Sequence, residues 1–146
     1  MIETSTMVAS TDSENTAYRH FAKMLDYLFK GTQLKVLDGE PGSLAVKEDM
    51  ISNQPLYPNT AESTHTLSTS SIKKIDAIVY MKIRKTKVEL SNDEWKKPLT
   101  STATALKQQS KNLRSNLSIL NSLQQKYRIK TESILAMAVI GYTGYI

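Results

Sequence analysis

The stretch that decides the fold is Ile75-Asp-Ala-Ile-Val-Tyr-Met-Lys-Ile83. Its odd positions are all apolar, whereas its even positions mix polar and apolar side chains. Because successive side chains of a strand point to opposite faces, this pattern predicts one strand with a dry face and a mixed face. The apolar positions become even at Val88 and Leu90, so a bulge or a tight turn is expected within residues 84–87. The absence of glycine there favours the bulge.

A helix is predicted before this strand, over about residues 13–30. Its apolar side chains recur every three or four residues, and Thr11 and Glu14 have the spacing of a capping box. Gly31 then supplies a residue suited to a left-handed helix cap.

A longer helix is predicted after the strand, from about Thr100 to Lys126. Leu106, Leu113 and Leu120 are seven residues apart, but the companion row contains Ser110 and is only partly apolar. A self-sufficient coiled coil needs both rows apolar, so this helix is expected to lie on a sheet or in a bundle.

The remaining segments give weaker patterns. Residues 33–47 predict a hairpin around a Gly- and Pro-containing turn, and residues 91–94 have a capping-box pattern that predicts a short helical turn. A long Ser/Thr-rich loop is expected at about residues 50–71, and residues 1–12 are expected to be a flexible terminus. The uncharged segment 134–146 fits either a buried helix or a final strand.

Together these elements predict a single α+β domain over residues 13–146. The expected architecture has two layers, an antiparallel sheet with the N-terminal helix and the long C-terminal helix packed on one face.

Composition narrows the chemistry. The 146 residues contain no cysteine and two histidines, which excludes disulfides, thiolate metal sites and a cysteine nucleophile. Neither His20 nor His65 is followed by a histidine or a carboxylate at i+3 or i+4, and no phosphate-binding glycine loop or nucleophile elbow is present. We therefore expect no cofactor, no metal and no enzymatic activity. No apolar run approaches the ~20 residues that span a bilayer, so membrane insertion is not expected.

The charge is divided unevenly along the chain. Residues 1–71 contain five Lys or Arg against nine acidic residues, a net −4, whereas residues 72–146 contain fourteen against five, a net +9. An aromatic flanked by cations on a sheet can stack a base while neutralising phosphates. A nucleic-acid-binding surface is therefore an alternative function, with these candidate residues: Lys73, Lys74, Tyr80, Lys82, Arg84, Lys85, Lys87, Lys107, Lys111 and Arg114.

The favoured function is a non-enzymatic subunit of an intracellular, cytoplasmic or nuclear, multiprotein assembly. The long helix and the uncharged C-terminal segment have more apolar surface than a short hairpin can cover, so they are expected to contact another protein subunit, of the same or a different kind. The candidate partner-binding residues are Leu113, Leu117, Leu120, Ile134, Leu135, Met137, Val139 and Ile140.

Overall fold

A computed structural model describes residues 13–39, 41–53, 75–141 and 143–145 of the chain. The predicted flexible terminus and most of the predicted loop at 50–71 lie outside these residues. The elements in chain order are α1 (Glu14–Leu28), β1 (Leu34–Asp38), α2 (Leu44–Asn53), β2 (Ala77–Ile83), β3 (Thr86–Lys96), α3 (Thr102–Gln125), β4 (Ala138–Ile140) and β5 (Thr143–Tyr145).

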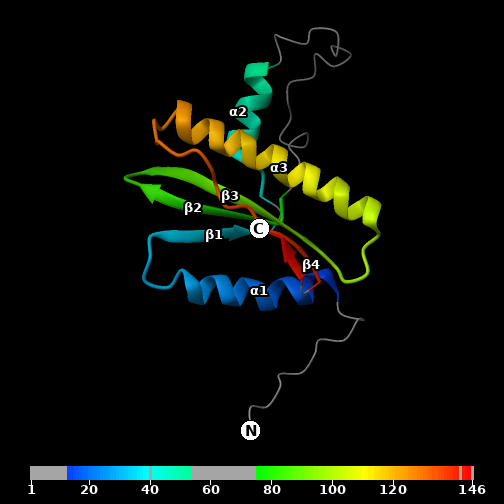
Figure 1. Ribbon diagram of the computed structural model, residues 1–146. Helices are drawn as coiled ribbons and strands as arrows, with labels where there is room; N and C mark the ends of the chain where they lie inside the picture. The colour runs from blue at the N-terminus through cyan, green and yellow to red at the C-terminus, as the bar shows by residue number, and fades with distance from the viewer. Residues whose placement is uncertain (1–12, 40, 54–74, 142, 146) are drawn as a thin grey trace.

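The five strands form one mixed sheet in the order β1-β2-β3-β4-β5. Strands β1, β2 and β3 form an antiparallel meander, β4 lies parallel to β3, and β5 returns antiparallel to β4. A parallel pair needs a crossover connection, and α3 provides it by packing across the sheet between β3 and β4 (Figure 1). The α+β class and the packing of the long helix on the sheet are confirmed, whereas the parallel pair was not expected.

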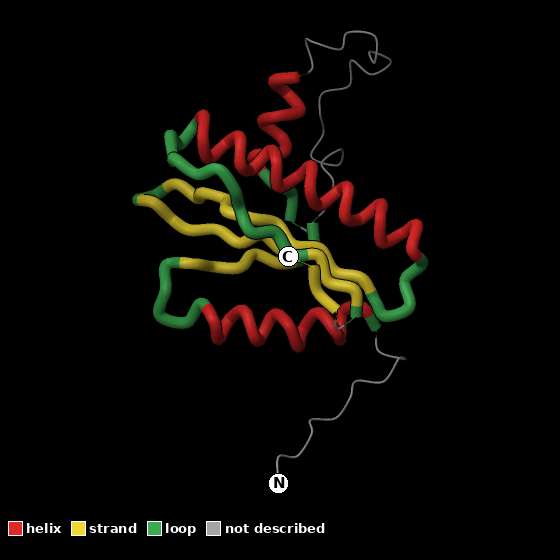
Figure 2. The backbone as a smooth tube through the Cα atoms, in the orientation of Figure 1, coloured by secondary structure: helices red, strands yellow, loops and turns green. Residues whose placement is uncertain are grey.

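Helices cover both faces of the sheet (Figures 1 and 2). On one face, Trp95 packs with Val139 and with the α1 rings of Tyr18 and Phe21, whose centroids lie 5.1 and 4.5 Å from the indole. On the other face, Ile119 and Leu123 of α3 pack against β3 and α2. The expectation placed both helices on one face. Strand β3 is buried on both sides from Ser91 to Trp95, and it therefore needs a helix over each face.

The parity change after β2 arises from a tight turn and not from a bulge within residues 84–87. Ile83 pairs with Thr86, and Arg84 adopts a left-handed conformation with φ of 57°. This conformation strains a non-glycine residue, and the long β2–β3 ladder stabilises it. A bulge does occur in this ladder, but between Val79 and Tyr80.

Four local predictions were wrong. Residues 44–47, expected as the second strand of a hairpin, begin α2, and residues 50–53 of the expected loop belong to the same helix. The capping-box pattern at Ser91–Glu94 lies inside β3, where pairing with β2 overrides it. The N-cap of α1 is Ser13, whose Oγ accepts the N–H of Thr16, and not Thr11.

The C-terminal segment contains two short strands. Residues 134–137 are irregular, and β4 and β5 follow them. Gly141 at the turn between these strands has φ of +61°, and a Cβ there would lie 3.1 Å from Cγ of Pro98. Glycine is therefore required at this close approach. Among the helices of the described residues, none has the length and apolarity to cross a bilayer.

Candidate functional site

Helix α3 turns a polar surface toward the sheet and leucines toward solvent. Gln108, Asn112 and Asn116 are buried, whereas Leu113 is 68% exposed. A buried polar side chain beside an exposed apolar one reverses the usual arrangement, so this interface is the most informative part of the molecule. Among the described residues, the buried apolar side chains of α3 are Ile119 and Leu123, which lie in its C-terminal half.

Asn116 completes the hydrogen bonding of β3. Strand β4 pairs only with Glu94–Lys96, and the backbone of Asn92 lies beyond its end. The Asn116 side chain accepts the Asn92 N–H at 2.9 Å and donates to the Asn92 carbonyl at 2.9 Å. One amide thus replaces a neighbouring strand at this position.

A buried ion pair lies next to this amide contact. The Nζ atom of Lys111 is 2.6 Å from Oε1 of Glu94, and the Glu94 side chain is only 2% exposed. Asn112, one residue further along α3, donates to the carbonyl of Met137 at 2.9 Å. This contact holds the segment before β4 against the same helix.

Asp76, the residue before β2, brings a second carboxylate to the site. Its Oδ2 atom accepts the N–H of Trp95 at 2.6 Å, which extends the β2–β3 ladder by a side-chain bond. The Nζ atom of Lys96 lies 4.0 Å from the same oxygen and 2.6 Å from the Trp95 carbonyl. About a quarter of the side-chain surface is exposed to solvent in each of Asp76, Lys96 and Lys111. Solvent therefore reaches the cluster from one side.

These four groups interact electrostatically. Burial raises the pKa of Glu94, and the negative charge of Asp76 adds to this rise. Lys111, through its hydrogen bond and its charge, and Lys96, through its charge, lower the Glu94 pKa and so oppose the rise. On the opposite face of β3, burial raises the pKa of Asp93 to about 7, against a lowering hydrogen bond from the Met137 N–H. We call Asp76, Glu94, Lys96 and Lys111 the charged cluster.

Two buried amides near the cluster have side-chain atoms without hydrogen-bond partners among the described residues. Gln108, one turn before Lys111 on α3, uses neither its Oε1 nor its Nε2 atom, and the Asn92 side chain is likewise unpartnered. Gln108 is 6% exposed and Asn92 is fully buried. An unmade hydrogen bond of this kind costs about 1–3 kcal/mol, so each calls for a reason beyond stability.

The described residues contain no group of three or more His, Asp or Glu side chains placed to hold a metal. The charged cluster offers two carboxylates. Mg²⁺ commonly takes one or two carboxylates from a protein and completes its shell with water and substrate phosphate oxygens. The donor set of Asp76 and Glu94 is therefore suited to a magnesium ion shared with a phosphate.

The predicted nucleic-acid residues lie in separate places. Lys82, Arg84 and Lys85 are exposed around the β2–β3 turn, where Lys87 lies 4.8 Å above the ring of Tyr80. Lys107 and Arg114 are exposed on the N-terminal half of α3, whereas Lys111 pairs with Glu94. The C-terminal end of α3 lies near the turn, through the Tyr127–Lys87 contact, so Lys107 is roughly 27 Å away along the helix. Lys73 and Lys74 lie outside the described residues.

The predicted partner-binding residues also divide. Leu113, Leu117 and Leu135 are exposed, and Val139 is buried beneath α1. The others are half-buried: Leu120, Ile134, Met137 and Ile140.

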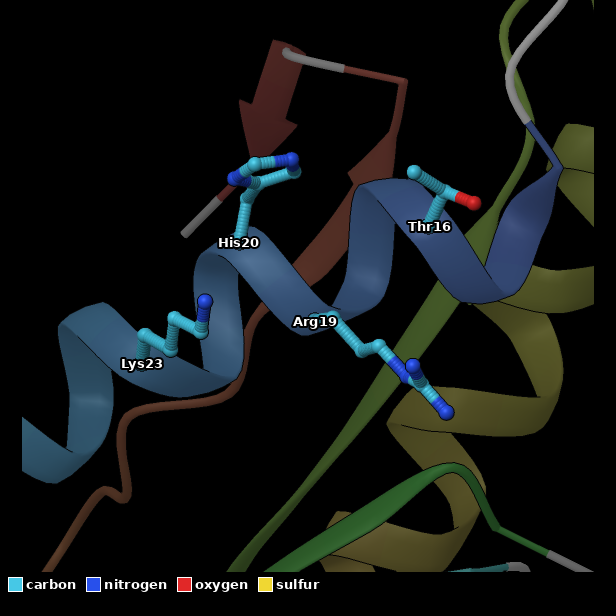
Figure 3. A pocket seen from close by; sticks show the side chains of 4 residues that line it. All are labelled: Thr16, Arg19, His20 and Lys23. Carbon is cyan, nitrogen blue, oxygen red and sulfur yellow. The ribbon is translucent and has the colours of Figure 1, made fainter.

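A hollow of about 260 Å³ borders α1, lined by Thr16, Arg19, His20 and Lys23. Figure 3 shows that Arg19 extends away from the side of the helix on which His20 and Lys23 stand. All four residues are exposed and their polar atoms do not converge on one point, so this hollow offers less chemistry than the charged cluster.

Comparison of the chain with protein-family models, curated proteins and solved structures finds no match.

Sequence reasoning missed this cluster. The capping-box pattern predicts that Glu94 belongs to a helix start, and the alternation predicts that Asp76 is a polar position of a strand. A signal was present, because three charged residues, Asp93, Glu94 and Lys96, surround the single tryptophan in what is a buried strand. Only the antiparallel pairing of β2 with β3 brings Asp76 beside Lys96.

Proposed function

We propose that the chain hydrolyses phosphodiester bonds of nucleic acid, with a divalent cation bound by Asp76 and Glu94. The observation that carries this proposal is the convergence of two carboxylates and two lysines from β2, β3 and α3. A buried ion pair contributes little stability compared with apolar packing of the same volume. A charged cluster beneath a helix that exposes its leucines is therefore better explained by chemistry than by stability.

Each side chain has a role in this proposal. A bound Mg²⁺ would lower the pKa of a water molecule and offset the charge on the phosphate. The Asp76 and Glu94 carboxylates would hold the cation, and the Lys111 ammonium opposes the rise that burial causes in the Glu94 pKa. Lys96 presents a cation beside Asp76, where it can neutralise a phosphate oxygen as negative charge develops.

Water is the only co-reactant that hydrolysis of the phosphodiester requires. The water oxygen forms a bond to phosphorus, the phosphorus–oxygen ester bond breaks, and the departing oxygen takes up a proton. Exposed cations near the site, Lys97, Lys107 and Arg114, favour a polyanionic substrate, as does the net charge of +5.

The test is cleavage of end-labelled single-stranded DNA, duplex DNA and RNA with Mg²⁺ or Mn²⁺, and with a chelator in excess. We expect cation-dependent cleavage that falls at least 100-fold in Glu94→Gln and in Lys96→Met. Glu48→Gln is the matched control, because Glu48 forms an exposed pair with Lys126 away from the cluster. Circular dichroism of each variant checks that it is folded. Absence of cleavage by the folded wild-type chain, or undiminished cleavage by the folded Lys96→Met variant, would overturn the proposal.

Nucleic-acid binding at the β2–β3 turn is a second proposal, supported by the exposure of Lys82, Arg84 and Lys85. Neutralised phosphates make log affinity fall linearly with log salt, by about 0.7–0.9 per contact. Lys82→Glu with Arg84→Glu should abolish binding without altering the charged cluster. An unchanged affinity would remove this surface from consideration.

The enzymatic proposal departs from the expectation of a non-enzymatic subunit, which stays a prediction. Contact with another protein remains compatible with catalysis, because the exposed leucines of α3 and the charged cluster occupy opposite sides of that helix.

A further inference from the structure

The solvent-facing side of α3 carries an apolar stripe. Leu106, Leu113 and Leu117 are 57%, 68% and 55% exposed. Their spacing of seven and four residues places them on one helical face, about three turns long. Exposed leucines in a row at this spacing are the pattern that a second amphipathic helix recognises.

The charges beside this stripe are all of one sign. Lys107 and Arg114 are exposed, each next in sequence to a leucine of the stripe. Helix α3 contains no aspartate or glutamate over its 24 residues. Its outer face therefore presents leucines bordered by positive charge alone.

This charge pattern distinguishes between occupants. Lys107 and Arg114 lie on the same flank of the stripe, so two copies of α3 packed antiparallel would bring these cations of one copy against those of the other, with no carboxylate on either helix to neutralise them. Like charges at a helix–helix contact oppose association and act against the wrong partner. A helix with aspartate or glutamate beside its apolar positions would pair with both cations.

We propose that the outer face of α3 binds an acidic amphipathic helix of another protein, which seats apolar side chains between Leu106, Leu113 and Leu117 and places carboxylates against Lys107 and Arg114. The leucine stripe lies on the other side of α3 from Lys111, whereas Lys107 and Arg114 are one turn from Lys111 and are also the cations that the proposed function places near its substrate. Peptide binding and cleavage are measured separately, so failure of one proposal is distinguishable from failure of the other.

The test uses two labelled synthetic helices and the full chain. Both peptides are four heptads long with Leu at positions a and d; one has Glu and the other has Lys at positions e and g. Fluorescence anisotropy should give at least tenfold tighter binding of the Glu peptide. The Lys107→Glu/Arg114→Glu variant should reverse the preference.

Apolar variants test the stripe itself. Leu113→Ser/Leu117→Ser should weaken binding of the Glu peptide at least tenfold, while Leu28→Ser, an exposed leucine of α1, should leave it unchanged. Two results would overturn the proposal: equal affinity for the two peptides, including no detectable binding of either, or a dimer in sedimentation equilibrium that Leu113→Ser/Leu117→Ser dissolves.

Discussion

Lys111 on α3 places its ammonium nitrogen 2.6 Å from Oε1 of Glu94 on β3, and this contact joins the long helix to the most deeply buried carboxylate of the charged cluster. The pair lies where apolar side chains would ordinarily fill the interface between a helix and a sheet. Its consequences for stability can be measured separately from catalysis.

Lys111→Met should destabilise the fold by about 3 kcal/mol at pH 8, because it leaves the buried Glu94 charge without a partner. Urea denaturation followed by circular dichroism measures this change. The loss should be smaller at pH 5, where protonation removes the uncompensated charge from a carboxyl whose pKa is already raised by burial. Addition of Glu94→Gln to Lys111→Met should recover part of the stability.

Lys126→Met provides the control for that measurement. Lys126 also lies 2.6 Å from a carboxylate, that of Glu48, but both side chains are more than 40% exposed. An exposed pair contributes under about 1 kcal/mol. Equal losses for Lys111→Met and Lys126→Met would contradict the role assigned to burial.

Asp93 should make stability depend on pH. Burial raises the pKa of Asp93 to about 7, whereas an unfolded aspartate titrates near 3.9. Between these values the folded chain retains a proton that the unfolded chain has released. The contribution of this proton is therefore fully present below about pH 4 and is lost as the pH rises through about 7.

Asp93→Asn should remove this dependence and stabilise the chain at pH 8. The asparagine stays neutral, and its Oδ1 atom can still accept the Met137 N–H. The measurement is the free energy of unfolding at pH 5 and pH 8, with the exposed Asp26→Asn as control. If wild type and Asp93→Asn lose equal stability between these pH values, Asp93 does not titrate as argued.

Asn116→Ala should cost about 2–4 kcal/mol. It leaves the N–H and carbonyl of Asn92 unpaired in a buried place, and each such group costs about 1–3 kcal/mol. Ser110→Ala, an exposed change on the same helix, should be neutral or slightly stabilising, because alanine favours helices. Hydrogen exchange should show faster exchange of the Asn92 amide in Asn116→Ala; unaltered protection would show that water or a neighbour replaces the side chain.

Glu89→Ala should loosen α2. Its carboxylate accepts the Ser43 hydroxyl at 2.7 Å and the N–H groups of Leu44 and Ala45 at 3.0 and 3.2 Å, so it caps the helix from a neighbouring strand. Carboxylates at a helix N-terminus also interact favourably with its dipole. We expect a loss of about 2–3 kcal/mol, against about 1 kcal/mol for Ser43→Thr, which retains a hydroxyl. A loss for Glu89→Ala no larger than that for Ser43→Thr would show that the Glu89 carboxylate does not cap α2.

The sequence predicted the elements whose signal is local. The alternation from Ile75 to Ile83 identified β2, and the leucine spacing identified α3. Both patterns arise within one segment, because the spacing of its apolar side chains matches the period of the strand or helix that it forms. The α+β class followed from the order of these elements.

Secondary structure predicted from local sequence patterns was wrong where contacts with residues distant in the sequence determine the backbone conformation. Residues 44–47 alternate like a strand, but Glu89, more than forty residues later, caps them as a helix. Residues 91–94 resemble a helix cap, but pairing with β2 extends them. Tertiary contacts override such short-range preferences because they bury more surface and satisfy more backbone groups.

By itself, the sequence determined that this chain forms one long helix, a central strand and a basic C-terminal half without cysteine chemistry. Only the tertiary structure decided that Asp76, Glu94, Lys96 and Lys111 meet. It also decided that α3 turns its amides toward the sheet and Leu106, Leu113 and Leu117 toward solvent. The physical reason is that helical spacing identifies which residues share a face, whereas the burial of that face depends on the strand against which it packs.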